Sequence, residues 1–267
     1  MLDELAAIAA GTRPPVEPRD AASVILLREA GGIGSAEALL MIRQRSMNFA
    51  PGMVAFPGGS VDPSDSLAPV ELTDSGADEW ATALGVDAGT VRLILSAAIR
   101  ETFEETGVLL ATKAGEGVDA TTPEWRKRRH SLENHDLVWS ALIDETGITL
   151  TPETLHPWSC WVTPVGETRR YRTWFFLASV PGDTRVEIES TEAFRSAWIA
   201  PDDALAAFER GEIQMLPPQQ SILRDLAAEL RNTSLAELQS APRTPERVEP
   251  VVRFDSEGPY LDIPGGR

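Results

Sequence analysis

Two runs of hydrophobic positions near the N-terminus have the length of strands. Residues 21–28 (AASVILLR) and 38–43 (ALLMIR) are continuous and largely aliphatic, and three glycines lie between them. Apolar runs of this length, bounded by glycines, are typical of strands buried on both faces. The sequence therefore predicts two buried strands joined by a turn.

A longer apolar pattern with the helical period follows in the middle of the chain. Within residues 91–106, the positions spaced i, i+3, i+4 and i+7 are occupied by small or aliphatic side chains: Leu95, Ala98, Ile99 and Thr102. This spacing gives a helix one face that packs against a core. Gly107 is a residue that commonly ends a helix. We predict a helix over residues 91–106.

The remaining patterns mix strands with helices. Strands are predicted at residues 155–162, 173–180 and 193–199, and helices in the polar region 123–145 and at residues 201–209, 218–230 and 234–239. Trp80 and Leu84 suggest a short helix in an otherwise polar, acidic stretch. Such a mixture, with a long helix entered after a glycine-rich loop, favours an α/β sandwich.

Two segments lack any regular period. Residues 48–66 are dense in Gly, Pro, Asp and Ser, as in a shaped loop, and residues 242–267 are rich in Pro and Gly. We expect one elaborated domain over residues 1–241 and an extended C-terminal arm over residues 242–267, two small domains being the alternative. The arm could serve a homodimer.

Composition and charge exclude several classes of function. The chain has 267 residues, 42% hydrophobic, and a formal charge of −17, which argues against binding nucleic acid or an anionic membrane surface. No apolar run reaches the roughly 20 residues of a membrane span, and the N-terminus lacks the basic start of a secretory signal. A cytoplasmic enzyme is expected. Cys160, the only cysteine, excludes an intrachain disulfide and is interpreted as a small buried side chain.

Three acids of the predicted helix share one of its faces. Glu101, Glu104 and Glu105 are related by i, i+3 and i+4, so their carboxylates converge. Carboxylate oxygens are the ligands that Mg²⁺ and Mn²⁺ prefer. The alternative is an ordinary solvated helix face, since glutamate is a good helix former.

The loop upstream decides between these interpretations. Phe-Pro-Gly-Gly at 56–59, followed by RETFEETGV at 100–108, resembles the signature of the Nudix superfamily: G, five residues, E, seven residues, then REUxEExGU, where U is a bulky aliphatic residue. Asp65 replaces the first glutamate, and Thr102 occupies an aliphatic position. Between Asp65 and Arg100 lie 34 residues where the signature has seven.

That interruption is typical of one branch of the superfamily, which the chain resembles over residues 20–230: the coenzyme A diphosphatase-like group that includes a peroxisomal mammalian enzyme. The resemblance implies a Nudix-type α/β/α sandwich with a mixed sheet and an insertion at about residues 66–90. It also implies hydrolysis of a phosphoanhydride by a water activated by Mg²⁺ or Mn²⁺.

Residue roles follow from the same resemblance. Glu101 and Glu105 would be the principal metal ligands, Glu104 a ligand or a neighbouring acid, and the Gly58 carbonyl a backbone ligand. Arg100 would hold the glutamates in orientation. Asp65 is expected to stabilise the loop and not to bind metal. Two further acids, Glu192 and as an alternate Glu189, are the candidates for the general base.

A second motif of the branch points to the substrate. Its tail, GxxxFPGG, is matched by residues 52–59, but Asn48 stands where the motif has its second arginine. The resemblance favours coenzyme A or acyl-coenzyme A, and Phe56 and Gly59 of this motif are expected to contact the substrate. Arg43, Arg45 and Arg172 are expected to contact its phosphates. Arg169 and Arg170 are further candidates for phosphates, because guanidinium groups match phosphate oxygens. Any of these arginines could instead pair with surface carboxylates.

Several polar groups are given structural roles. The basic run at 126–129 is interpreted as a solvated helix face. His130, His135 and His156 have no ligand-like spacing and are interpreted as structural. Two other functions stay open: an ADP-ribose or nucleotide-sugar pyrophosphatase with the same glutamates, and a Nudix-fold binding module without catalysis, which the three intact glutamates disfavour.

Overall fold

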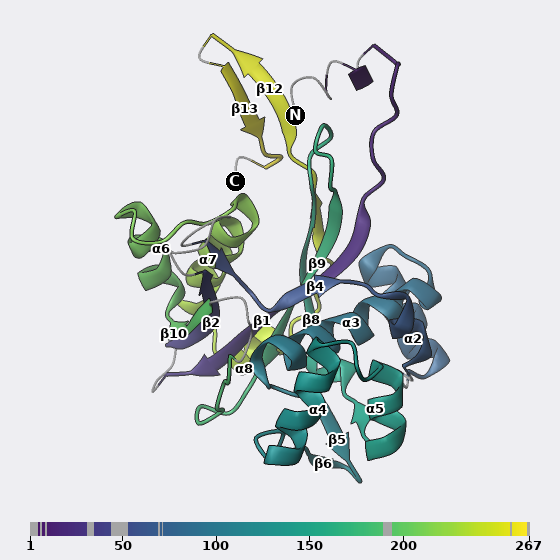
Figure 1. Ribbon diagram of the computed structural model, residues 1–267. Helices are drawn as coiled ribbons and strands as arrows, with labels where there is room; N and C mark the ends of the chain where they lie inside the picture. Colours follow the sequence, from purple (N-terminus) through teal and green to yellow (C-terminus); the bar gives the residue numbers. More distant parts are fainter. Residues whose placement is uncertain are drawn as a thin grey trace.

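The computed structural model describes residues 10–30, 35–43, 53–68, 72–188, 194–256 and 258–265, with the single positions 5, 7, 8 and 70 (Figure 1). Its centre is a mixed sheet in the order β10-β2-β1-β9-β8-β11. The strands are β1 (Arg19–Glu29), β2 (Ala36–Arg43), β8 (His156–Val162), β9 (Tyr171–Ser179), β10 (Phe194–Ile199) and β11 (Glu246–Val248). Strand β1 runs antiparallel to β2 and parallel to β9.

Two short strands bring the glycine loop to this sheet. Strand β3 (Val54–Ala55) pairs with β2, and β4 (Gly58–Ser60) pairs with β1, so that Gly59 lies opposite Ala22. The loop 48–66 was expected to have little regular structure. Its second half is instead fixed along the centre of the sheet by backbone hydrogen bonds.

Helices cover both faces of the sheet. Those described are α2 (Asp74–Leu84), α3 (Ala88–Thr106), α4 (Pro123–Glu133), α5 (Trp139–Thr146), α6 (Pro201–Glu209), α7 (Pro217–Leu230) and α8 (Leu235–Ser240). Successive side chains of a strand point to opposite faces. In β1, Val24 and Leu26 accordingly join the core beneath α3, whereas Ile25 and Leu27 join the core beneath α7. The α/β/α sandwich with a mixed sheet is confirmed.

The insertion belongs to the α3 layer. It begins at the end of the 3₁₀ helix η1 (Pro63–Leu67) and contains α2, whose Trp80 packs edge-on against Phe176 of β9 with ring centroids 5.9 Å apart. A second 3₁₀ helix, η2 (Pro152–Thr154), and a small sheet of β5 (Ala111–Lys113), β6 (Glu116–Gly117) and β7 (Thr149–Leu150) lie beyond α3.

The helical region expected at residues 123–145 consists of two helices, α4 and α5. The chain turns between them because His135 has a positive φ of 59°, which a continuing helix does not allow. The segment 134–138 therefore separates the two helices.

The C-terminal segment is more than an arm along the surface. Strand β11 pairs in parallel with β8, and Val248 is fully buried, so this segment forms one edge of the central sheet. Strands β12 (Val251–Asp255) and β13 (Gly258–Asp262) then form a separate hairpin. The sequence lacks the alternation that would reveal β11, because only Val248 of its three residues is buried. The homodimer expected from this arm stays a prediction.

Among the described residues, no single helix passes a length and hydropathy test for crossing a membrane. Residues 76–84 and 88–106 pass it only jointly, as a pair bent by 85°.

Candidate active site

Helix α3 carries the central acids and is fixed at both ends. Asp87 caps its first turn by accepting a hydrogen bond from the Thr90 N–H at 3.0 Å, and Gly107 ends it with a φ of 74°. The expected core stripe is fully buried. Glu101 and Glu104 lie on another face, where their side chains retain 16% and 17% of their exposure.

A buried ion pair joins this helix to the glycine loop. Arg100 donates to both carboxylate oxygens of Asp65, from Nε at 2.8 Å and from Nη2 at 3.0 Å. Asp65 also accepts the Asp62 N–H at 2.8 Å, which completes the N-terminal cap of η1. Asp65 thus stabilises the loop, as expected, and bridges the 34 residues that separate it from Arg100.

The other guanidinium hydrogens of Arg100 hold the acids and the loop. Nη1 donates to Glu101 at 2.9 Å and to Glu104 at 3.3 Å, and Nη2 donates to the Ser60 carbonyl at 3.1 Å. Arg100 therefore lies where a residue that orients the two glutamates must lie. That functional role remains a prediction.

Both glycines of the loop are required by close approaches. A Cβ on Gly59 would lie 2.5 Å from the Glu101 carboxylate, and a Cβ on Gly58 would lie 2.4 Å from the Ala22 carbonyl oxygen. The Gly58 N–H donates to Glu105 at 2.7 Å. The third glutamate is therefore held by the loop backbone, whereas Glu101 and Glu104 share Arg100.

Burial raises the pKa values of two of the acids. Desolvation raises the pKa of Glu104 to about 7, although Arg100 opposes the shift, and it raises the pKa of Glu101 in the same way. Burial alone would lower the pKa of Arg100, but the hydrogen bond to Asp65 and the charges of Glu101, Asp65 and Glu104 outweigh it. Three carboxylates, those of Asp65, Glu101 and Glu104, surround the single guanidinium of Arg100, so acidic groups outnumber basic ones there.

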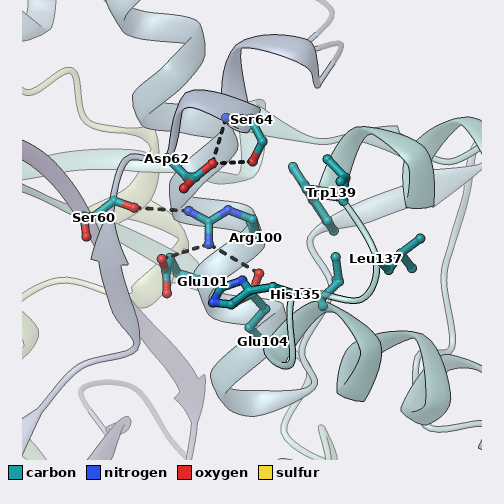
Figure 2. A pocket seen from close by; sticks show the side chains of 11 residues that line it. Ser60, Asp62, Ser64, Arg100, Glu101, Glu104, His135, Leu137 and Trp139 are labelled. Atoms are coloured by element: carbon teal, nitrogen blue, oxygen red, sulfur yellow. Dashed lines mark hydrogen bonds and ion pairs between the residues drawn. The ribbon is translucent and has the colours of Figure 1, made fainter.

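These acids open into a cavity of about 490 Å³ (Figure 2). One wall is the loop, with Ser60, Asp62 and Ser64, and the floor is α3, with Arg100, Glu101 and Glu104. The opposite wall comes from α4, α5 and the segment between them: Leu132, His135, Leu137, Val138 and Trp139. The cavity is thus acidic and polar on one side and largely apolar on the other.

The donor set suits a hard divalent cation, since carboxylate oxygens are what such ions prefer. The raised pKa values of Glu101 and Glu104 point the same way, because a nearby cation would stabilise their charged forms. Within the described part of the chain, no three His, Cys, Asp or Glu side chains converge closely enough to hold a metal ion. Glu105 faces Gly58, so rotation of its side chain would be needed to join the other two.

Two of the residues expected to bind substrate lie elsewhere. Phe56 is buried in the α7-side core, edge-on to Phe175 with centroids 6.4 Å apart, and not in the cavity. Arg172 pairs with Asp20 at 2.6 and 2.9 Å, and the hydrogen bond to Asp20 raises its pKa. Phe56 was misplaced because a sequence motif does not show which face of the sheet a side chain occupies. Arg172 was misplaced because the sequence does not show that Asp20 lies opposite it in the sheet.

Other basic groups are also engaged in the fold. Arg170 is buried and bonds to Glu249 at 2.6 Å, as well as to the carbonyl oxygens of Thr163 and Val16. The basic run 126–129 is not simply a solvated face, because Arg129 is buried and its Nε donates to the Glu104 carbonyl at 2.8 Å. Arg129 therefore holds the last turn of α3, where backbone carbonyls lack helical partners.

Four predictions cannot be placed. Arg45, Glu189 and Glu192 lie outside the described residues, and Arg43 ends β2 with a side chain whose position is not described. The general base accordingly stays a prediction. The apolar wall and His135 were missed, because the short segment 134–138 carries no periodic signal that could have revealed them.

A three-layer α/β/α sandwich, with a glycine loop closed on a carboxylate-bearing helix, defines a hydrolase of the Nudix fold. The crystal structure of a Nudix hydrolase from Alicyclobacillus acidocaldarius superimposes with a TM-score of 0.68 and 25% identity, covering 86% of this chain and 98% of that one. The family described as the NUDT19 Nudix domain matches residues 73–226, more than half of the chain. The chain therefore belongs to the Nudix family, in the NUDT19 group.

Two curated relatives carry the same name. Acyl-coenzyme A diphosphatase NUDT19 of Homo sapiens is 33% identical over 63% of this chain and 48% of its own length. Its namesake from Gallus gallus is 29% identical over 75% of this chain and 66% of its own length. The chain thus spans between about half and two thirds of these relatives. Members of the Nudix family generally use divalent metal ions.

Proposed function

We propose that this chain hydrolyses the diphosphate bond of coenzyme A or an acyl-coenzyme A, using Mg²⁺ or Mn²⁺. The observation that carries the proposal is the cavity in which Arg100, Glu101 and Glu104 face an apolar wall. The relatives named acyl-coenzyme A diphosphatase supply the substrate class.

The two sides of the cavity suit the two parts of such a substrate. A diphosphate requires positive charge, which a cation on the acids of α3 would provide. The organic part next to it can pack on apolar side chains such as Leu137 and Val138, the latter 47% exposed. An apolar wall supports coenzyme A over a nucleotide sugar, whose organic groups are polar.

The chain's own residues prepare the site in three ways. Arg100 fixes the carboxylates of Glu101 and Glu104, while Gly59 leaves room for the Glu101 carboxylate beside the loop. A bound divalent cation would polarise the phosphoanhydride and lower the pKa of water. The proposed ligands are Glu101, Glu104 and Glu105. To join the other two, the Glu105 side chain would give up its hydrogen bond from the Gly58 N–H.

The test is a substrate panel with the purified chain. Coenzyme A, an acyl-coenzyme A and ADP-ribose are each incubated with Mg²⁺, Mn²⁺ or EDTA, and products are identified by mass spectrometry. We expect coenzyme A to yield 4′-phosphopantetheine and adenosine 3′,5′-bisphosphate only when a cation is present. Preference for ADP-ribose would replace the substrate assignment, and no turnover of any diphosphate would favour a binding module.

A pair of variants distinguishes the loss of a metal ligand from the loss of any carboxylate charge. Glu101→Gln should reduce kcat/KM at least about 100-fold, because it removes a charged ligand. Glu124→Gln is the matched control, since Glu124 is exposed on α4 and pairs only with Arg128 in the described structure. Equal activity of both variants would contradict the proposed ligand set.

A further inference from the structure

The turn between α4 and α5 places an imidazole in the cavity wall. Figure 2 shows His135 beside Glu101 and Glu104, across the cavity from the loop that carries Asp62 and Ser64. No spacing in the sequence connects this histidine with the acids. They come together because α4 packs against α3, with Arg129 bonded to the Glu104 carbonyl.

The backbone at His135 is one that favours glycine. Its φ is 59°, its N–H donates to the Leu132 carbonyl at 2.9 Å, and the Asp136 N–H donates to the Ser131 carbonyl at 2.8 Å. These two bonds form the Schellman motif that ends α4, and the residue at this position is most often glycine, because a Cβ is unfavourable there. The end of the helix does not require an imidazole, and a glycine would adopt this positive φ at a lower energy than a residue with a side chain.

The hydrogen-bond donors of the cavity are few. All five guanidinium N–H groups of Arg100 are accounted for by Asp65, Glu101, Glu104 and the Ser60 carbonyl. The Ser64 hydroxyl donates to Asp62 at 2.6 Å. No hydrogen bond from a described residue reaches the His135 imidazole. The Trp139 indole N–H donates to the Ser96 hydroxyl at 3.2 Å. Among the side chains of the described lining residues, His135 is therefore the one that offers a nitrogen donor not already used.

We propose that His135 is a substrate-binding residue whose imidazole N–H donates to a non-bridging phosphate oxygen of the bound diphosphate. This inference rests on the proposed function and extends it to a wall that the Nudix signature does not include. Leu137 and Val138 follow on the same turn, so one short segment would contact both the phosphate and the apolar part of the substrate.

Two variants at this position separate the imidazole from the backbone. His135→Gly removes the side chain and relieves the positive φ, whereas His135→Ala removes the imidazole but keeps a Cβ. Ala114→Gly is the control, because Ala114 has a positive φ of 53° and does not line the cavity. We expect the urea midpoint of His135→Gly to equal or exceed that of the wild type, and Ala114→Gly to behave likewise.

Kinetics with coenzyme A and Mg²⁺ give the decisive readout. Both His135 variants should raise KM about tenfold, with kcat within about threefold of the wild type, since the contact binds the substrate before reaction as well as during it. Ala114→Gly should leave both constants unchanged. An unchanged KM in His135→Ala, or an equal rise in Ala114→Gly, would overturn the assignment. Wild-type protein without diphosphatase activity would refute the proposed function itself.

Discussion

Replacing Glu104 by glutamine should stabilise the metal-free protein while it removes activity. Burial raises the pKa of Glu104 from 4.5 to about 7 in the folded chain. A carboxyl group whose pKa is raised by folding binds its proton more tightly in the folded state. Folding stability is therefore lost as pH rises between these two values, and the full penalty applies above pH 7.

The magnitude follows from the size of the shift. The difference between 4.5 and about 7, at 1.36 kcal/mol for each pH unit, corresponds to about 3 kcal/mol at pH 8. At pH 5 the penalty is below about 1 kcal/mol by the same arithmetic. Glutamine is uncharged at both pH values and retains an oxygen that can accept from Arg100 Nη1, now 3.3 Å from Glu104.

Urea unfolding in EDTA, followed by circular dichroism, tests this difference at pH 5 and pH 8. The free energy of unfolding of Glu104→Gln should exceed that of the wild type by about 3 kcal/mol at pH 8 and by less than about 1 kcal/mol at pH 5. Glu124→Gln, at an exposed ion pair, should change stability by less than about 1 kcal/mol at both. If Glu104→Gln lowered stability equally at both pH values, burial of the charge would not be costly and the reasoning would fail.

Three further substitutions test other contacts. Gly59→Ala should lower kcat/KM at least about tenfold with little change in the urea midpoint, since its Cβ would displace the mobile end of Glu101; unaltered kinetics would contradict this. Asp65→Ala should lower the free energy of unfolding, measured with urea, by about 3 to 5 kcal/mol, because it leaves Arg100 buried without its main partner. A decrease of less than about 1 kcal/mol would disprove the pairing. Val248→Ala should lower the free energy of unfolding by about 2 kcal/mol, because this side chain is fully buried. An unchanged thermal unfolding midpoint would contradict the packing of β11 at the edge of the sheet.

Local periodicity explains why much of the sandwich could be predicted. The strand patterns near β1 and β2 and the helical stripe of α3 each depend on side chains that face one core. The same logic corrects the basic run on α4. Four consecutive helical residues, turning about 100° each, cannot all face solvent, and Arg129 is the member that lies inside.

The substrate-facing wall could not be predicted in this way. His135 reaches the cavity only through the end of one helix and the packing of that helix on another, and neither leaves a repeating pattern in the chain. Phe56 shows the converse error. Its motif is adjacent to the site in sequence, but its side chain enters the opposite core.

The long interruption of the Nudix signature is tolerated because closing it costs little. Loop-closure entropy grows as the logarithm of loop length, so extending seven residues to 34 costs about 1.4 kcal/mol. The buried pair of Asp65 and Arg100 then holds the two halves together, because removing either partner would leave the other charge buried and unpaired. Helix α2 offsets part of the closure cost, because its Trp80 packs against the core. Two distant halves of a motif can therefore keep one geometry, provided that their contact is a buried ion pair with every hydrogen bond satisfied.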